Sequence, residues 1–279
     1  MARSGGNLAR RLAVAAVGIP IVLLVAWLGE VLLAIGLGVL AVVAVRELGR
    51  MLAVTERPFL WRLAPAAAAA LPTVAWTVGW GGFSLFVAST LIVMLGVATL
   101  RIPPDRGPFE ATALSFTSVL YVGGLLSFAL LLRETLVEDR AFGFALFLLP
   151  VVITWVADSA AYFAGRAFGK RPMAPIVSPN KTVEGGIAGL LAGPVAALLM
   201  AYAAVPQLAA LGPLRLGITG LLVAAAAILG DLAESALKRE CGVKDSSNLL
   251  PGHGGLLDRM DSLLFAFPVA YLCLALWLR

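Results

Sequence analysis

Acidic, basic and hydroxyl side chains of the kinds that handle phosphates gather in two stretches, residues 154–186 and 230–262. Asp231 directly follows the apolar run 221–229, so it lies at or inside a membrane boundary, where a carboxylate is costly and usually functional. In the second stretch, five polar residues follow the spacing i, i+3, i+4, i+7 and i+8 and therefore share one helix face: Asp231, Glu234, Ser235, Lys238 and Arg239.

Two further carboxylates, Asp258 and Asp261, stand three residues apart at the start of the last apolar run. With Asp231 they predict a site for a hard divalent cation, because Mg²⁺ takes one or two carboxylates together with waters and substrate phosphates. The alternative is a buried ion network in which the acids pair with the nearby cations Lys238, Arg239 and Arg259.

A glycine-rich turn lies between these acids, with the sequence Pro-Gly-His-Gly-Gly at 251–255. Such a turn entering a helix offers backbone N–H groups to a phosphate, and here Lys244 and Arg259 flank it. A simple tight turn is the alternative. His253, the single histidine, is a candidate general base, phosphate donor or loop hydrogen-bonding group.

The first stretch places Asp158 on a helix with Tyr162 and Arg166 at i+4 and i+8. A buried Asp–Arg pair on that helix is the alternative to a functional acid. Further along, Ser178 and Lys181 precede the next apolar run, and Lys181 is a candidate ligand for a phosphate or a lipid headgroup. An interfacial lysine that extends towards water is the competing interpretation.

The composition indicates what must position these side chains. Of the 279 residues 61% are hydrophobic and 13% are charged, whereas soluble domains have about 45–50% apolar and about 25% charged residues. This excludes a soluble enzyme, a disordered chain and a disulfide scaffold, and strands of an outer-membrane barrel would alternate apolar and polar residues. The sequence therefore predicts an all-α polytopic membrane protein.

Nine apolar segments are long enough to cross a bilayer, and the one at 60–80 is expected to be kinked by Pro65 and Pro72. The segments are 11–29, 31–49, 60–80, 82–100, 110–132, 141–165, 184–205, 214–237 and 260–278.

Positive charge indicates the orientation. With the N-terminus in the cytoplasm, 17 of the 21 Lys and Arg residues fall in cytoplasmic segments, as the positive-inside rule requires. The net charge of +5 therefore indicates membrane topology rather than nucleic-acid binding. We expect residues 1–140 to form anchoring helices with a possible lipid cavity, and residues 141–279 to carry the catalytic motifs.

The C-terminal motifs resemble those of the phosphatidate cytidylyltransferases, also called CDP-diacylglycerol synthases. The matching residues are Ser235-Ala-Leu-Lys238-Arg239, Lys244-Asp-Ser-Ser247 and Leu250-Pro-Gly-His253-Gly-Gly-Leu-Leu-Asp258-Arg259-Met-Asp261. Elements at 157–159, 178–182 and 230–232 are similar too, so the resemblance covers residues 155–279. Family members often have glycine where this chain has Ser247.

The resemblance implies that CTP and phosphatidic acid react to give CDP-diacylglycerol and pyrophosphate, with Mg²⁺ and possibly K⁺ as cofactors. It implies a homodimer in the bacterial inner membrane whose active site faces the cytoplasm. It makes Asp231, Asp258 and Asp261 metal ligands and Lys238 and His253 catalytic residues. Substrate-binding roles fall to Ser178, Lys181, Ser235, Arg239, Lys244, Arg259 and Asp158.

Two other classes of function remain open on the sequence alone. A transporter would use Asp158 and Asp231 along an ion path, although the polar residues cluster at one membrane face. A related CTP-dependent enzyme would act on another lipid, such as a polyprenol, and a panel of lipid substrates discriminates between the two enzymes.

Overall fold

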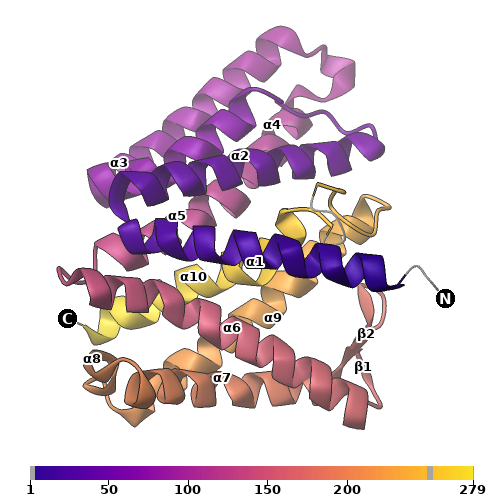
Figure 1. The fold of residues 1–279 in the computed structure, drawn as a ribbon. Coiled ribbons are helices and arrows are strands. Elements are labelled where there is room, and N and C mark those ends of the chain that lie inside the picture. Colours follow the sequence, from indigo (N-terminus) through magenta and orange to yellow (C-terminus); the bar gives the residue numbers. More distant parts are fainter. Residues whose placement is uncertain (1–3, 250–253, 279) are drawn as a thin grey trace. The chain divides into compact units, whose positions relative to one another are not determined.

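A computed structural model describes residues 4–249 and 254–278, with side chains from residue 16 onward (Figure 1). Nearly all of the described chain is helical, as the composition predicts. The elements are α1 Ser4–Leu28, α2 Glu30–Val54, α3 Leu63–Arg101, η1 Pro104–Arg106, α4 Pro108–Ser118, η2 Val119–Gly124, α5 Leu125–Glu134, α6 Arg140–Phe168, β1 Pro172–Ala174, β2 Ser178–Thr182, α7 Val183–Ala203, α8 Pro206–Ala209, α9 Pro213–Glu240 and α10 Leu257–Trp277.

The chain packs into two compact units that do not follow a single cut of the sequence. The first contains Met1–Leu130 and Glu240–Arg259, and the second contains Leu131–Arg239 and Met260–Arg279. Part of the C-terminal motif region therefore packs with the N-terminal helices. The expectation that residues 1–140 anchor the protein and residues 141–279 carry the catalytic motifs stays a prediction.

Seven helices of the described chain are long and apolar enough to cross a membrane. One of them is the continuous helix Pro108–Glu134, which passes through the π-helical turn η2. The multi-pass, all-helical architecture is confirmed, whereas the count of nine spans and the cytoplasmic N-terminus stay predictions.

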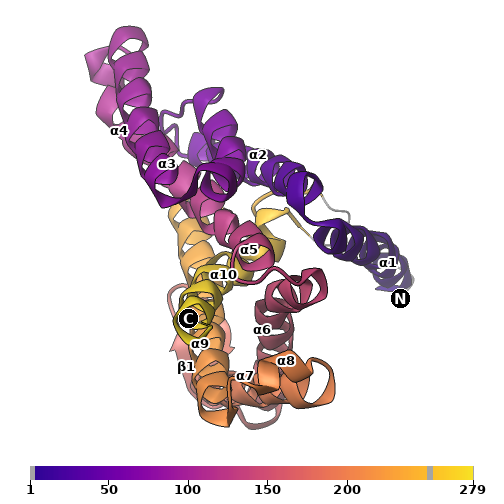
Figure 2. The same cartoon turned by 90° about the vertical axis from the view of Figure 1, so that its left-hand side faces the viewer.

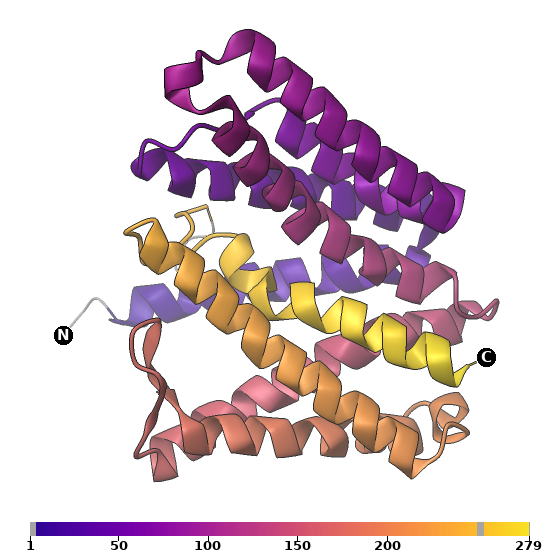
Figure 3. The same cartoon turned by 180° about the vertical axis from the view of Figure 1, so that it is seen from behind.

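The predicted segments 60–80 and 82–100 both lie in α3, which is interrupted at Gly79. Gly79 has φ 68° and ψ −164°, a conformation that glycine adopts without the clash a Cβ would cause. The chain reverses direction there, and the second half of α3 runs back across the first unit (Figure 3). Gly79 is the residue inside α3 with non-helical dihedral angles, and a kink from Pro65 and Pro72 stays a prediction.

The helices of the second unit approach one another through small residues. A Cβ at Gly185 of α7 would lie 2.6 Å from the carbonyl oxygen of Ala161 in α6. Figure 2 shows α7 beside both α6 and α9. Close backbone approach of this kind is how helices gain packing energy in a lipid environment, where burial of apolar surface drives association only weakly.

A short antiparallel hairpin, β1–β2, connects α6 to α7 and was not predicted from the sequence. Pro172 pairs with Thr182 and Ala174 with Ser178. Thr182 also caps α7, since its hydroxyl accepts a hydrogen bond of 3.2 Å from the backbone N–H of Gly185. The hairpin therefore fixes the residues just before α7 against the ends of α6 and α7 (Figure 1).

Candidate functional site

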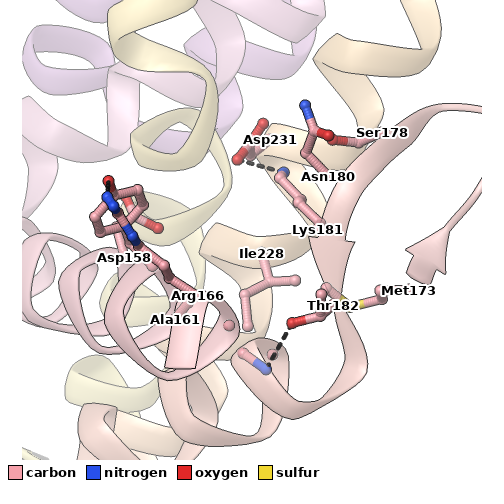
Figure 4. A pocket seen from close by; sticks show the side chains of 14 residues that line it. Asp158, Ala161, Arg166, Met173, Ser178, Asn180, Lys181, Thr182, Ile228 and Asp231 are labelled. Carbon is pink, nitrogen blue, oxygen red and sulfur yellow. Dashed lines mark hydrogen bonds and ion pairs between the residues drawn. The ribbon is translucent and has the colours of Figure 1, made fainter. Parts of the chain in front are cut away.

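A cavity of about 520 Å³ opens in the second unit between α6, the hairpin strand β2, the start of α7 and α9. Its polar wall comes from two of these helices and from the hairpin (Figure 4). The polar side chains that line it are Asp158, Tyr162, Arg166, Ser178, Asn180, Lys181, Thr182 and Asp231. The structure thus brings together four of the residues selected from the sequence, Asp158, Ser178, Lys181 and Asp231.

An ion pair between Lys181 and Asp231 crosses the cavity, joining β2 to α9 (Figure 4). Both side chains keep partial access to solvent, with 27% and 31% of their surface exposed. The other oxygen of Asp231 accepts a hydrogen bond of 3.4 Å from Ser235, one turn further along α9. The exposed surface of Lys181 belongs to its carbon stem, because its ammonium nitrogen is itself buried. A ligand that binds this nitrogen must therefore displace Asp231 from it.

Asp261 belongs to the same acidic group, although it comes from α10. The contact depends on Gly230, because a Cβ there would lie 2.5 Å from the carbonyl oxygen of Asp261. Asp158, Asp231 and Asp261 are close enough to repel one another electrostatically. Three helices therefore concentrate negative charge at one end of the unit.

The cations at the end of α9 have partners on the chain. Lys238 forms an ion pair with Glu234, whose side chain has no exposed surface. Arg239 donates to the carbonyl oxygen of Val177 in the hairpin, at 3.3 Å. Glu234 was noted only as a member of the shared helix face, but its i, i+4 spacing from Lys238 is the signal that indicates this pair.

The remaining predicted residues lie in the first unit or outside the described chain. Asp258 accepts hydrogen bonds from the backbone N–H groups of Ser246 and Gly255 and from the Ser246 hydroxyl, at 2.8–3.0 Å. Lys244 and Arg259 are exposed, and His253 falls outside the described residues. Asp258 thus fastens the chain that leads into α10.

Glu47 of α2 is the main residue that sequence reasoning missed. It is 1% exposed and accepts hydrogen bonds from the backbone N–H groups of Leu256 and Leu257 at 3.0 and 2.8 Å. Of the turn 251–255 that was expected to cradle a phosphate, Gly255 donates its N–H to Asp258, and residues 251–253 lie outside the described chain, so the cradle stays a prediction. A carboxylate inside the apolar segment 31–49 was the signal that could have identified Glu47.

A second contact in the first unit joins the loop after α2 to the end of α9. Arg57 donates to Glu240 at 2.5 Å, and this hydrogen bond and the charge of Glu240 raise the pKa of the Arg57 guanidinium above its ordinary value. Because both side chains are substantially exposed, the pair adds little to stability. The pair acts locally, since it fixes the position of Glu240, the last residue of α9, from which residues 241–249 continue.

Within residues 16–249 and 254–278, no group of three or more His, Cys, Asp or Glu side chains is arranged to hold a metal ion. Asp231 and Asp261 are carboxylates near one another in the second unit, and Asp258 lies in the first unit. A cation here would have to complete its coordination with ligands other than protein carboxylates.

Comparison with known proteins shows what the chain is similar to. A sequence profile described as "Cytidylyltransferase family" matches residues 9–277. Curated relatives include a phosphatidate cytidylyltransferase of Haemophilus influenzae, 43% identical over 170 residues, or 59% of this chain and 57% of the relative. A phosphatidate cytidylyltransferase of Bacillus subtilis is 36% identical over 199 residues, which is 70% of each chain.

A third relative, a phosphatidate cytidylyltransferase of Staphylococcus aureus, is 40% identical over 166 residues, 59% of this chain and 60% of the relative. The matched region thus spans between 57% and 70% of the lengths of these three proteins.

Proposed function

Because the chain belongs to the cytidylyltransferase family, we propose that it transfers the cytidylyl group of CTP to phosphatidic acid, giving CDP-diacylglycerol and pyrophosphate. The observation that carries this proposal is the cavity in which Lys181 meets the carboxylates of Asp158 and Asp231. The curated relatives are named for the same activity. Both substrates are phosphates, and such a cavity offers them a cation beside a possible metal position.

In this reaction the protein must position the substrates and stabilise their charge, and it need not supply a nucleophile. An anionic phosphate oxygen of the lipid forms a new bond to the α-phosphorus of CTP, and the bond from that phosphorus to the bridging oxygen of pyrophosphate breaks. Both reactants are anions, so cations must lower their repulsion. Lys181 and Ser178 on β2 are proposed to bind a phosphate of CTP or of the lipid.

Magnesium is proposed as the cofactor on the chemistry of the donor set. Asp231 and Asp261 are hard oxygen ligands that repel one another, a condition that a divalent cation relieves. Mg²⁺ commonly uses one or two carboxylates and fills its other positions with waters and substrate phosphates. When bound, it supplies positive charge to the phosphates. Asp258 remains a proposed ligand, and K⁺ a proposed second ion, from the resemblance.

The other sequence-based roles are retained as proposals. Cations outside the cavity wall, Lys238, Arg239, Lys244 and Arg259, are assigned to the CTP phosphates, and Ser235 supports Asp231 through their hydrogen bond. His253 keeps its candidate role.

We also propose the finer topology. Counting α3 as two passes, because of the reversal at Gly79, and α1 as one pass brings the seven candidate helices to nine. An N-terminus in the cytoplasm of a bacterial inner membrane then places the polar ends of α6 and α9 near cytosolic CTP. A homodimer is proposed from the family resemblance.

The proposal is tested by turnover of the purified protein in detergent with labelled CTP, phosphatidic acid and Mg²⁺, with and without EDTA. We expect CDP-lipid and pyrophosphate to form only when the lipid is present, and we expect EDTA to abolish their formation. Product with another lipid and none with phosphatidic acid would contradict the proposed substrate. A folded protein that does not bind CTP would contradict the proposed reaction.

A further inference from the structure

A buried carboxylate in the N-terminal half binds the C-terminal motif. Glu47 lies near the end of α2, and within the described chain it accepts from four groups of residues 246–257, about two hundred positions later. We name residues 244–249 and 254–259 the motif segment. We propose that Glu47 is a positioning residue that fixes the motif segment for the reaction proposed above.

The geometry shows that Glu47 holds the two described ends of this segment at once. On one side, its carboxylate accepts from the hydroxyls of Ser247 at 2.5 Å and Ser246 at 3.3 Å. On the other side, it accepts from the N–H groups of Leu256 and Leu257 at 3.0 and 2.8 Å. Leu257 is the first residue of α10 and Leu256 directly precedes it, and N–H groups at a helix start have no intrahelical acceptor.

The negative charge of Glu47 is favourable beside the start of α10. The start of a helix carries a partial positive charge from its aligned peptide dipoles, and a carboxylate there is stabilised by it. A buried carboxylate that lost its partners would be costly, so Glu47 and the motif segment stabilise each other only when both are in place. This mutual dependence fixes one conformation of the segment.

Gly255 shows how tightly the contact is packed. A Cβ at this position would collide with the hydroxyl of Ser246 and would lie 2.8 and 2.9 Å from the two oxygens of Glu47. The same Ser246 hydroxyl, which has one hydrogen to share between the two acids, lies 2.9 Å from Asp258. Glu47 therefore acts on Asp258, a proposed metal ligand, through one intervening side chain.

Ser247 donates to Glu47 at 2.5 Å, closer than Ser246, Leu256 or Leu257. Ser247 thus provides a test that leaves the carboxylate in place.

Glu47→Gln is the principal variant, because the amide keeps the size of the side chain but cannot offer two acceptor oxygens. We expect amide hydrogen exchange in peptides covering residues 254–260 to rise at least about tenfold, with peptides from α3 unchanged. We expect kcat to fall at least about tenfold. Glu56→Gln, the same change at an exposed site just after α2, is the control and should match the wild-type protein in both measurements.

Ser247→Ala separates positioning from general stability. Its effect on kcat and exchange should be smaller than that of Glu47→Gln, and it should vanish in the double variant, because Ser247 acts through Glu47. Where Glu47→Gln does not fold, Ser247→Ala must still raise exchange in residues 254–260 for the proposal to stand.

Three results would overturn the proposal. The first is an amide hydrogen exchange rate in residues 254–260 of Glu47→Gln that equals the wild-type rate. The second is a rise in exchange in Glu47→Gln that is equally large throughout α2 and α3. The third is a Ser247→Ala effect on kcat and exchange that is as large in the double variant as in the single one. The exchange measurement needs no substrate. If the wild-type protein makes no CDP-lipid, the proposed function fails while the exchange result still decides the role of Glu47.

Discussion

Lys181 and Asp231 form an ion pair in the wall of the cavity, and the ammonium nitrogen of Lys181 is buried in that pair. The energetic consequence is that substrate must compete with the ion pair. A phosphate that binds Lys181 gains a charge-assisted hydrogen bond and releases Asp231 from its partner. The pair thus links the arrival of a phosphate to the availability of a carboxylate.

Lys181→Ala should mainly weaken substrate binding. Loss of a hydrogen bond to a charged group predicts a rise of about tenfold in KM for CTP or for phosphatidic acid. Lys170→Ala, at an exposed position before the hairpin, is the matched control and should leave both constants near the wild-type values. Unchanged KM for both substrates in Lys181→Ala would remove Lys181 from the phosphate site.

Asp231→Asn should lower kcat by about 100-fold or more at every Mg²⁺ concentration, because it removes a charge proposed to hold the cation. It is a sharper test than Asp258→Asn, since the Asp258 carboxylate also holds three hydrogen bonds of the chain. Asp105→Asn, an exposed change beyond α3, is the control. Near-normal turnover of a folded Asp231→Asn protein would contradict the metal assignment.

At the scale of elements, the turn at Gly79 makes one long apolar helix into two antiparallel parts. Without it, α3 would be 39 residues long, about twice the length of a typical span. Its positive φ, rather than any contact, requires glycine, because nothing lies within 4 Å of the position where a Cβ would be.

Gly79→Ala should therefore destabilise the protein by roughly 1–3 kcal/mol through backbone strain. We expect the thermal midpoint in detergent to fall by several degrees. Gly96→Ala provides the contrast within α3: its backbone φ is ordinary and its Cβ would meet nothing within 4 Å. That variant should be neutral or slightly stabilising, because alanine is the better helix former. Equal midpoints for the two variants would contradict this explanation.

The helices could be predicted because a spanning helix leaves a long apolar run in the sequence. The hairpin could not, since strands of three and five residues that include Pro172 and Pro179 give no alternating pattern. A break between the segments 60–80 and 82–100 was expected, but the positive φ at Gly79 could not be predicted, because a glycine's φ is set by the chain around it.

Some residues of the candidate site could be predicted from the sequence and others could not. Asp231, Lys181 and Asp158 could be selected because each acid or base stands out beside an apolar run. Glu47 was passed over, although it stands out equally, because its partners lie about two hundred residues away. Spacing along one helix predicts contacts such as Lys238 with Glu234, but not contacts made by tertiary packing.

At the scale of the whole molecule, the proposed nine passes would place the two termini on opposite sides of the membrane. Reporters fused to each terminus should show the N-terminus in the cytoplasm and the C-terminus outside it. Both termini on the same side would mean an even number of passes and would contradict the count. The reversed orientation would contradict the interpretation of the Lys and Arg bias.

The position of Glu47 also bears on how the protein is made. Helix α2 leaves the ribosome long before Leu256, Leu257 and the two serines exist. Until α10 is synthesised, the carboxylate has none of these donors, and an isolated acid within a membrane helix costs about 3 kcal/mol. This cost is relieved when residues 246–257 are made and donate to the carboxylate, so the packing of α2 is completed by a part of the chain synthesised about two hundred residues later.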